Sequence, residues 1–219
     1  MMVSQPMVVQ LKLAAGSFNV LLGTTLSGKT TLMLLALGEQ RPDSGSVSRS
    51  GAVIYCPQRT DAPSPDVIEW LASSDRDAHR LRGLFGVSPA WADRWTSLSH
   101  GERKRVQVAA ALWREPAVLL LDEPTNHMDE EGRRLLVGGL RQFAGVGLLV
   151  SHDRDLLDAL CEQCVFIEPP EVVVRPGTYT EALRAHRMDD EAKRRRRDEL
   201  SAELTRLRRE VARREHEAR

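Results

Sequence analysis

The sequence predicts an α/β protein built on a mostly parallel sheet with flanking helices. Along residues 17–160, short apolar runs alternate with segments of helical character, which is the pattern of parallel strands joined by crossover helices. A glycine-rich loop lies between the first apolar run and the first helix, and two adjacent acidic residues end a later run. Ligands of such sheets bind at the carboxyl ends of the strands, so both features predict a binding site at that edge.

The expected elements follow one another along the chain. Residues 17–22 and 52–56 are expected strands, with a helix at 29–37 between them. After a proline-rich loop, short helices are expected from Asp66 to Val87, with Asp66 as a candidate N-cap. The later elements are a helix at 99–113, a strand at 118–121, a helix at 130–143, a strand at 147–150, a helix at 153–160, a hairpin of 165–168 with 172–175, and a long helical stretch from 177.

This order predicts a nucleotide-binding domain over residues 1–180, with a helical subdomain at about 60–113, and a charged helix over residues 181–219. Lys+Arg and Asp+Glu both total 31, so the net charge gives no argument for a polyanionic partner. Three cysteines and no secretory signal fit a reducing compartment. Cys161 and Cys164 form a single C-x-x-C without a second pair for zinc, and they are interpreted as structural residues. No apolar stretch approaches the ~18–20 residues that span a bilayer.

The glycine-rich loop has the pattern G-x-x-x-x-G-K-[ST], which cradles phosphates with backbone N–H groups at a helix N-terminus. Lys29 would contact the β- and γ-phosphates, and the Thr30 hydroxyl would help to hold Mg²⁺. The alternative is an ordinary helix start with Thr30 as its cap. Leu26 stands where a glycine is usual, and its Cβ disfavours positive φ, which would cost about 1–3 kcal/mol if the loop requires it. The site residues expected here are Gly23, Thr24, Thr25, Leu26, Ser27, Gly28, Lys29, Thr30 and Thr31.

Two adjacent carboxylates, Asp122 and Glu123, follow the apolar run Ala117–Leu121 and precede a proline-stopped loop. At the exit of a strand, both can reach one site. Asp122 can then serve a metal ion while Glu123 addresses a water molecule. Together with the upstream loop, this pair predicts a nucleotide-hydrolysing site.

A second helix start carries the sequence Leu98-Ser99-His100-Gly101-Glu102. It resembles the signature motif Leu-Ser-Gly-Gly-Gln/Glu of the ATP-binding cassette superfamily. The resemblance implies that Ser99 and Gly101 contact the γ-phosphate held by an opposite domain. The alternative is an ordinary capping box of Ser99 and Glu102, and both can hold together. His100 replaces a glycine and adds bulk at this interface.

Three further residues match superfamily positions. Gln58 follows the second strand and resembles the glutamine loop, a Mg²⁺ and water contact. His152 ends a strand, where it would face the ligand crevice, and resembles the switch histidine. Asp129 resembles the loop that crosses to the partner domain. The adenine-stacking aromatic is not found, because the extreme N-terminus holds Met, Val, Ser, Gln and Pro.

Within the superfamily, the chain looks most like the ABC-F branch. The motifs are Thr125-Asn126-His127-Met128-Asp129, Ser151-His152-Asp153-Arg154 and Pro176-Gly177-Thr178-Tyr179-Thr180. This resemblance implies a cytoplasmic protein without a membrane domain that acts on the ribosome, as a translation factor or in antibiotic resistance. It also implies a helical linker that reaches RNA.

The tail fits such a linker. Four arginines, 194–197, suit phosphate contact, and apolar residues at 200, 204, 207 and 211 form a short coiled-coil seam. The alternative is a solvated charged helix. The return helix of a linker hairpin does not follow, which suggests the first half of a two-cassette chain.

The sequence therefore predicts an ATPase domain that uses ATP and Mg²⁺. Asp122 and Thr30 would hold the metal with Gln58, Glu123 would polarise the attacking water, and His152 would position the γ-phosphate. Its partners would be a second cassette, in a homodimer or in a missing second half, and the ribosome with its rRNA, with no direct membrane insertion. Two rivals are an ATPase subunit of a membrane transporter, which shares every catalytic motif, and a non-enzymatic binding module.

Overall fold

The computed structural model describes residues 9–217, except for the side chains of residues 210–212 and 214–217. The chain divides into two compact units, with the boundary between Thr180 and Glu181. The strands are β1 Phe18–Leu22, β2 Val53–Cys56, β3 Val118–Asp122, β4 Val146–Val150, β5 Cys161–Glu168 and β6 Glu171–Pro176. The helices are α1 Lys29–Leu37, α2 Pro65–Ala72, α3 Arg76–Phe85, the 3₁₀ segment η1 Pro89–Ser97, α4 His100–Trp113, α5 Glu130–Leu140, α6 Arg154–Leu160 and α7 Tyr179–Glu217.

The strands form one six-stranded sheet in the order β2-β3-β4-β1-β5-β6. The first five strands of this order are mutually parallel, and only β6 is antiparallel, in a hairpin with β5. This arrangement confirms the predicted α/β class with a mostly parallel sheet. Parallel strands end at the same edge, so the segments after β1, β2, β3 and β4 are brought together there.

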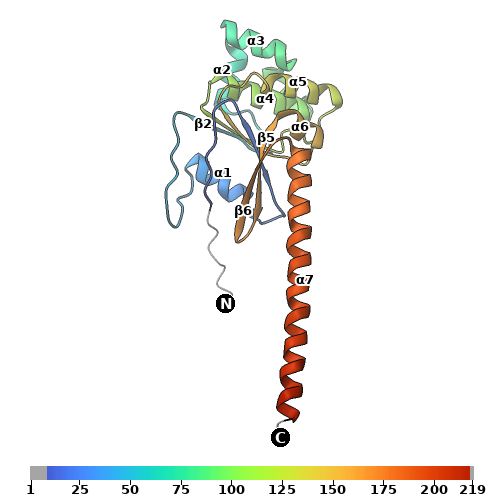
Figure 1. Ribbon diagram of the computed structural model, residues 1–219. Coiled ribbons are helices and arrows are strands. Elements are labelled where there is room, and N and C mark those ends of the chain that lie inside the picture. Colours follow the sequence, from blue (N-terminus) through green and yellow to red (C-terminus); the bar gives the residue numbers. More distant parts are fainter. Residues whose placement is uncertain (1–8, 218–219) are drawn as a thin grey trace. The chain divides into compact units, whose positions relative to one another are not determined.

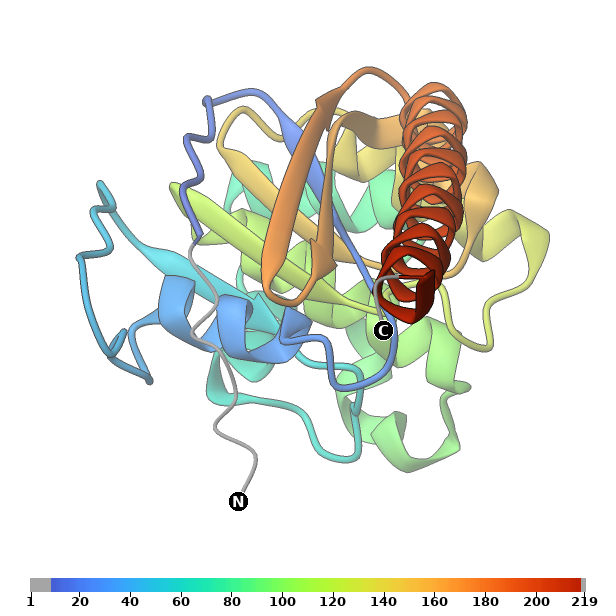
Figure 2. The same ribbon diagram turned by 60° about the horizontal axis from the view of Figure 1, so that its bottom comes forward.

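Both faces of the sheet are buried, which explains why its strands are continuous apolar runs. On one face, Leu21, Leu120 and Leu148 pack with Met33 of α1 in a single cluster. Figure 2 shows α1 running along the near side of the sheet. Alternate residues of the same strands, Val20, Leu119, Leu121 and Leu149, are also fully buried. Helices α4 and α5 lie on the other side of the sheet in Figure 1.

The helical segment between β2 and β3 begins differently from the prediction. Ser64, not Asp66, is the N-cap of α2, and its side chain accepts a hydrogen bond from the Val67 N–H. Pro65 occupies the first helical position, where its missing N–H is not needed, and this places Asp66 inside the first turn. The 3₁₀ segment η1 was not predicted; it anchors Trp91 and Trp95 in the core.

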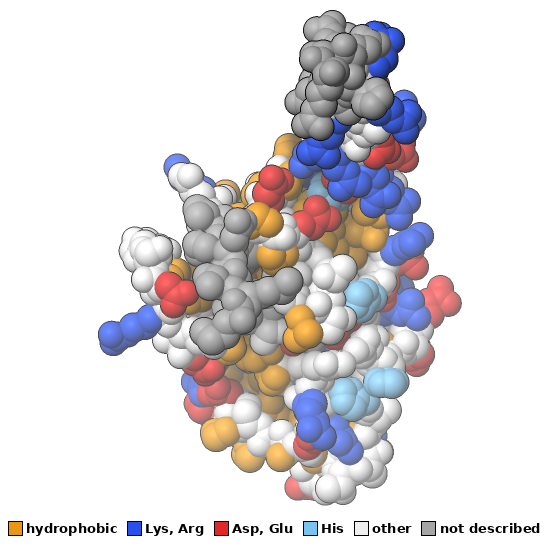
Figure 3. Space-filling model, turned by 90° about the horizontal axis from the view of Figure 1, so that it is seen from below, with side chains coloured by type: hydrophobic (Ala, Val, Ile, Leu, Met, Phe, Trp, Pro, Cys, Tyr) orange, Lys and Arg blue, Asp and Glu red, His pale blue; other side chains and the backbone are white. Residues whose placement is uncertain are grey.

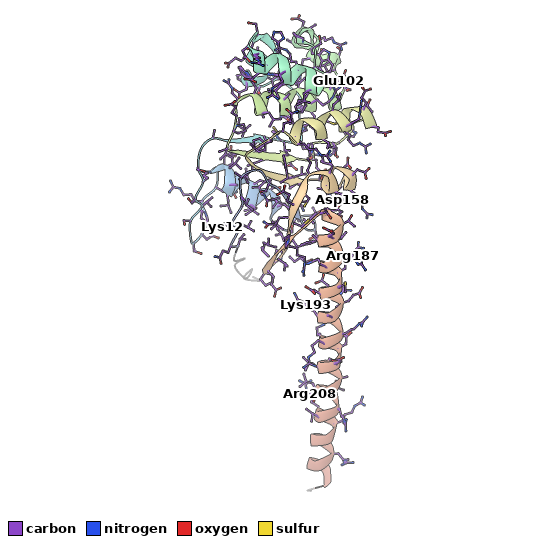
Figure 4. All side chains as sticks on the ribbon, turned by 45° about the horizontal axis from the view of Figure 1, so that its top comes forward. Lys12, Glu102, Asp158, Arg187, Lys193 and Arg208 are labelled. Carbon is purple, nitrogen blue, oxygen red and sulfur yellow. The ribbon has the colours of Figure 1, made fainter. Side chains whose placement is uncertain are left out.

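The remaining elements agree with the expected ones within a few residues. Helix α5 ends at Leu140 instead of Phe143, and β5 begins at Cys161 instead of Val165. In the second unit, α7 continues to Glu217. Figure 4 labels Arg187, Lys193 and Arg208 along this helix.

The leucines of the predicted seam, Leu200, Leu204 and Leu207, are about half exposed, at 44%, 56% and 50%. The side chain of Val211 lies outside the described residues. Among the described helices, none combines the length and the apolar character that a bilayer crossing requires.

Candidate functional site

The glycine-rich loop connects the end of β1 to the start of α1 at the carboxyl edge of the sheet. Gly23 is required for space, because a Cβ there would lie 2.6 Å from the Ile167 carbonyl oxygen and would collide with the Ser27 hydroxyl. Gly28, the N-cap of α1, is required for its left-handed backbone, with φ 104°. The two glycines of the motif therefore serve different geometric needs. Both make the tight turn into α1 possible.

Leu26 adopts the left-handed conformation that the sequence analysis treated as costly, with φ 66°. Its side chain is 98% exposed, so no burial offsets the unfavourable backbone. The loop thus imposes a glycine-like conformation on a leucine. Strain of this kind is typical of functional loops that the surrounding structure holds in place.

The loop carries an ammonium and a hydroxyl in different surroundings. The Lys29 ammonium donates hydrogen bonds to the carbonyl oxygens of Gly23, at 2.7 Å, and Thr24, at 2.8 Å. The Ser27 hydroxyl is buried without a hydrogen-bond partner among the described residues. No side chain caps α1, and its first turn carries no acidic residue. The loop and the helix start therefore offer an ammonium, a hydroxyl and uncapped N–H groups to an anion.

The two adjacent carboxylates stand at the end of β3, as predicted. Asp122 is the last residue of the strand and pairs in register with Val150 of β4. Glu123 has a left-handed backbone, with φ 45°, and its N–H donates to the Val150 carbonyl at 2.8 Å. This turn lets two consecutive side chains address the same edge of the sheet.

Glu123 and His152 are direct neighbours. Glu123 Oε2 accepts a hydrogen bond from the His152 backbone N–H at 3.3 Å, and Glu123 Oε1 lies 3.5 Å from His152 Nε2. Burial raises the pKa of Glu123, and the nearby charges of His152 and Lys29 act in the opposite direction. The glycine-rich loop follows β1 and the carboxylates end β3, so both lie at the carboxyl edge of the sheet. The His152 side chain is 90% exposed and free to turn toward a ligand.

Two residues that the sequence analysis did not identify lie at this edge: Tyr55 bonds a carboxylate, and Lys104 bonds the loop after β2. The Tyr55 hydroxyl donates to Asp122 Oδ2 at 3.1 Å, and burial, followed by the Asp122 charge, raises the pKa of Tyr55 to about 12. Lys104 is 1% exposed and donates to the Pro57 carbonyl and, at 3.1 Å, to Gln107 Oε1. Burial lowers the pKa of Lys104 to about 8.

Of these two residues, only Lys104 could have been identified from the sequence. Lys104 occupies the buried face of α4 between Gly101 and Val108, and a charge at a core position is unusual. Tyr55 is simply one residue of an apolar strand, and its hydroxyl partner depends on the pairing of β2 with β3. Lys104 also bonds the residue directly before Gln58. Gln58 itself is exposed on the loop after β2.

The second helix start is capped as expected. The Ser99 hydroxyl accepts from the Glu102 N–H at 3.2 Å, and Glu102 Oε2 accepts from the Ser99 N–H at 2.7 Å. A Cβ on Gly101 would lie 3.0 Å from Met128 Cγ and 3.2 Å from the His127 carbonyl oxygen. The glycine thus lets α4 pack against the segment that follows the carboxylates.

His100 packs against His127, with ring centroids 5.5 Å apart. Burial, and then the neighbouring His127, lower the pKa of His100. Figure 3 shows histidine side chains at the surface seen from below. Asp129 closes this segment as the N-cap of α5, with Oδ1 accepting from the Gly132 N–H at 2.8 Å.

The predicted residues therefore fall into two groups. The glycine-rich loop, Asp122, Glu123 and His152 lie at the carboxyl edge of the sheet. Ser99, Gly101 and Asp129 form a second group, around the start of α4. Among the described residues, no hydrogen bond or ion pair joins Ser99 or Asp129 to the glycine-rich loop. The expected adenine-stacking position falls in residues 1–8, outside the described residues.

Comparisons with known proteins agree with this geometry. A family model described as "ABC transporter" matches residues 7–126. Among curated relatives, GCN20 of Saccharomyces cerevisiae is 32% identical over 181 residues, which cover 78% of this chain and 24% of that protein. The ATP-binding protein Uup of Caulobacter vibrioides is 34% identical, over 78% of this chain and 31% of its own. The chain thus spans about a quarter to a third of the length of these relatives.

A solved structure of the archaeal ribosome recycling factor aABCE1, in complex with the ribosomal stalk protein aP1, superposes with a TM-score of 0.65. It is 26% identical and covers 81% of this chain and 37% of that one. The fold is therefore that of a P-loop NTPase. GCN20 and Uup are proteins of the ABC-F type, and members of the wider family are ATPases whose cassettes bind ATP and work in pairs. The chain belongs to the ATP-binding cassette family and resembles its ABC-F branch most closely.

Proposed function

We propose that this chain binds and hydrolyses ATP as one cassette of a composite pair, and that it acts on the ribosome in the cytoplasm. The observation that carries the enzymatic part is the contact between Glu123 and His152 at the carboxyl edge of the sheet, where the glycine-rich loop also lies. A buried carboxylate with a raised pKa, at the same edge of the sheet as the glycine-rich loop, suits a group that orients and polarises water.

The donor set of the site fits a Mg²⁺ ion. Oxygen ligands are the preference of this ion, and Thr30, Asp122 and Gln58 supply a hydroxyl, a carboxylate and an amide oxygen at neighbouring segments. Asp122 is already oriented by the Tyr55 hydroxyl. The buried, unpartnered Ser27 hydroxyl and the close fit around Gly23 also fit a loop shaped for an anion. When bound, the ion would neutralise phosphate charge.

Hydrolysis would depend on position and charge more than on covalent chemistry. The Lys29 ammonium would exchange its two carbonyl partners for the β- and γ-phosphates. Glu123 would hold the attacking water, since its carboxylate is fixed from one side by the His152 N–H. The exposed His152 ring would turn to the γ-phosphate. The uncapped N–H groups of Gly28, Lys29, Thr30 and Thr31 would complete the cradle.

The second group of residues would serve the nucleotide of another cassette. Ser99 and Gly101 present a helix N-terminus, and Asp129 lies on the adjacent loop. The partner would be a second copy of this chain or the second half of a longer protein. The name of aABCE1, a ribosome recycling factor, and the ABC-F relatives support a ribosomal target. The exposed arginines 194–197 of α7 suit contact with rRNA phosphates, in a translation factor or in antibiotic resistance.

Glu123→Gln tests the enzymatic proposal directly. The amide keeps the shape of the side chain but cannot polarise water as a base, so ATP should still bind while turnover falls by about 10²–10⁴-fold. Binding is measured by calorimetry with Mg²⁺–ATP, and turnover by phosphate release with and without ribosomes. Undiminished turnover by this variant would refute the assignment of Glu123. Absence of ATP binding by the unmodified chain would instead refute nucleotide binding itself.

The ribosomal part has a separate test. Ribosome co-sedimentation of the Glu123→Gln chain with ATP should exceed that without ATP, and should weaken steeply with added salt. Recovery in membrane fractions, with none in the ribosome fraction, would favour the transporter subunit instead.

A further inference from the structure

The two cysteines of the C-x-x-C segment lie against each other in the core. The Cys161 and Cys164 sulfur atoms are 3.4 Å apart, and both thiols are free. Their side chains are buried, with exposures of 5% and 0%. The proposed hydrolysis of ATP uses neither of them. Their burial agrees with the structural interpretation from sequence, but their close approach requires a separate explanation.

A bulge at the start of β5 causes this approach. Phe18 of β1 pairs with Cys161, Asn19 with Gln163, and Val20 with Cys164, so three steps along β5 match two steps along β1. Residues three apart on a regular strand point to opposite faces. The extra residue, Glu162, cancels this alternation of faces. Cys161 and Cys164 therefore face the same side of the sheet as their partners Phe18 and Val20. The Gly177 N–H fixes the bulge by donating to the Glu162 carbonyl at 2.8 Å.

The bulge also shortens the distance that a covalent bond would have to span. Two residue steps on a strand cover about 6.6 Å, whereas three regular steps cover about 10 Å. Disulfides join residues whose Cα atoms are about 4.4–6.8 Å apart. A regular strand would therefore forbid a bond between residues three apart, and the bulged strand permits it.

We propose that Cys161 and Cys164 form an oxidisable dithiol site, which hydrogen peroxide converts to an intramolecular disulfide in the folded protein. This proposal goes beyond ATP hydrolysis and does not depend on it. A small oxidant is required, because only 5% of Cys161 is exposed and a bulky disulfide reagent would not reach the sulfur.

Cys161 is the attacking sulfur, because it is 5% exposed whereas Cys164 is 0% exposed. The two thiols are in hydrogen-bond contact, in which either can donate; with Cys164 as the donor, this contact lowers the pKa of Cys161 and raises the pKa of Cys164. The Cys161 thiolate attacks the peroxide O–O bond, forming a sulfenic acid and releasing water after protonation. The Cys164 sulfur then attacks the Cys161 sulfur, the S–O bond breaks, and the second water leaves with the Cys164 proton. The two thiols are oxidised by two electrons, and one peroxide is reduced to two waters.

The third cysteine provides an internal control. Cys56 is 1% exposed, and burial raises its pKa to about 12. It is free, and no thiol contact of the described residues involves it. Trypsin separates it from the pair, because Cys56 falls in peptide 50–59 and both other cysteines fall in peptide 155–184. Cys56 is therefore a buried thiol like the other two, but it has no neighbouring sulfur among the described residues.

The experiment treats the native chain with hydrogen peroxide, quenches it, unfolds it and counts free thiols. The count should fall from three to one. Peptide 155–184 should lose two hydrogen atoms, and peptide 50–59 should remain a free thiol. Dithiothreitol should restore all three thiols. Circular dichroism before quenching shows that the chain was folded during oxidation.

Three results would overturn the proposal. The first is that three thiols remain while the chain is folded, and the second is that the Cys56 thiol is lost as fast as the pair. The third is that peptide 155–184 gains oxygen atoms instead of losing hydrogen. As a second check, Cys164→Ser should give no loss of hydrogen and should leave Cys161 as a sulfenic acid, which dimedone captures when the oxidised chain is unfolded in its presence. A disulfide-like mass loss in that variant would contradict the assignment of the bond.

Discussion

The N-termini of α1 and α4 differ in whether side chains cap their free N–H groups. Helix α1 begins at Gly28 with no side-chain cap and no acidic residue in its first turn. Helix α4 begins at Ser99 with a complete capping box, in which Glu102 and Ser99 bond each other's backbone. A carboxylate in the first turn stabilises a helix but repels a phosphate. The first start is thus left open for an anion, and the second is closed by the protein.

The difference suggests a division of labour within the proposed site. Unpaired N–H groups at α1 would receive phosphates of the nucleotide held by this chain. At α4, the Glu102 N–H already has a partner, so the hydroxyl proton of Ser99 and the nearby N–H groups remain for a nucleotide held by a partner. Because its N–H groups are capped by the protein, the start of α4 is stable without a ligand. This suits a nucleotide contact that forms only when two cassettes meet.

The largest expected effect comes from removing the charge at the open start. Lys29→Ala should weaken Mg²⁺–ATP binding by roughly 30- to 150-fold, because charge-assisted hydrogen bonds to phosphates are worth about 2–3 kcal/mol in total. Calorimetry measures the affinity. Lys12→Ala is the control, since Lys12 is a lysine of the first unit that lies outside the glycine-rich loop. A change below threefold for Lys29→Ala would remove α1 from the nucleotide site.

At the closed start, the cap and the proposed partner contact can be separated. Ser99→Ala should destabilise the fold by about 1 kcal/mol through the lost cap, and should also weaken the ATP-dependent pairing of the Glu123→Gln chain. Glu102→Ala removes the other half of the box, so it should cost similar stability but keep the Ser99 hydroxyl for pairing. Urea unfolding and sedimentation measure the two quantities. Equal loss of pairing in both variants would mean that Ser99 acts only as a cap.

The strained loop before α1 offers a smaller, opposite effect. Leu26→Gly should stabilise the chain by about 0.5–1 kcal/mol, since relief of a left-handed Cβ residue, about 1–2 kcal/mol, exceeds the entropic cost of glycine, about 0.5–1 kcal/mol. The exposed side chain contributes no burial to lose. Leu26→Ala keeps the Cβ and should give little gain. A destabilised glycine variant in urea unfolding would show that the leucine makes a favourable contribution.

The smallest effect is a titration at the start of α4. The pKa of His100 should lie below the ordinary histidine value of about 6.5, because burial and the neighbouring His127 disfavour its charged form. Fewer His100 rings are then protonated at pH 6.5 than in an unfolded chain. His127→Ala should raise the midpoint by removing the like charge. NMR of the ring protons follows both, and an unchanged midpoint in this variant would exclude coupling between the two rings.

The sequence predicted most of the sheet, and it located the residues of the candidate site on their strands and loops, because short sequence patterns specify such local structure. Strand-to-loop-to-helix order located Lys29, and the apolar run before Asp122 located the carboxylates. The ends of the helices and strands were predicted less accurately. Pro65 occupies the first helical position of α2, so the N-cap is Ser64 and not the expected Asp66. The left-handed turn at Glu123, which aims both carboxylates at one edge, has no sequence signal comparable to a glycine.

What the sequence by itself determined is the chemistry: which side chains carry charge, which loop can approach a phosphate, and which runs must be buried. Only the tertiary structure decided the partners, because Tyr55 meets Asp122 through the pairing of β2 with β3, and His152 meets Glu123 through the pairing of β3 with β4. The bulge that brings Cys161 to Cys164 likewise depends on how β5 aligns with β1. Strand pairing joins residues that are distant along the chain, and a local pattern contains no information about that distance.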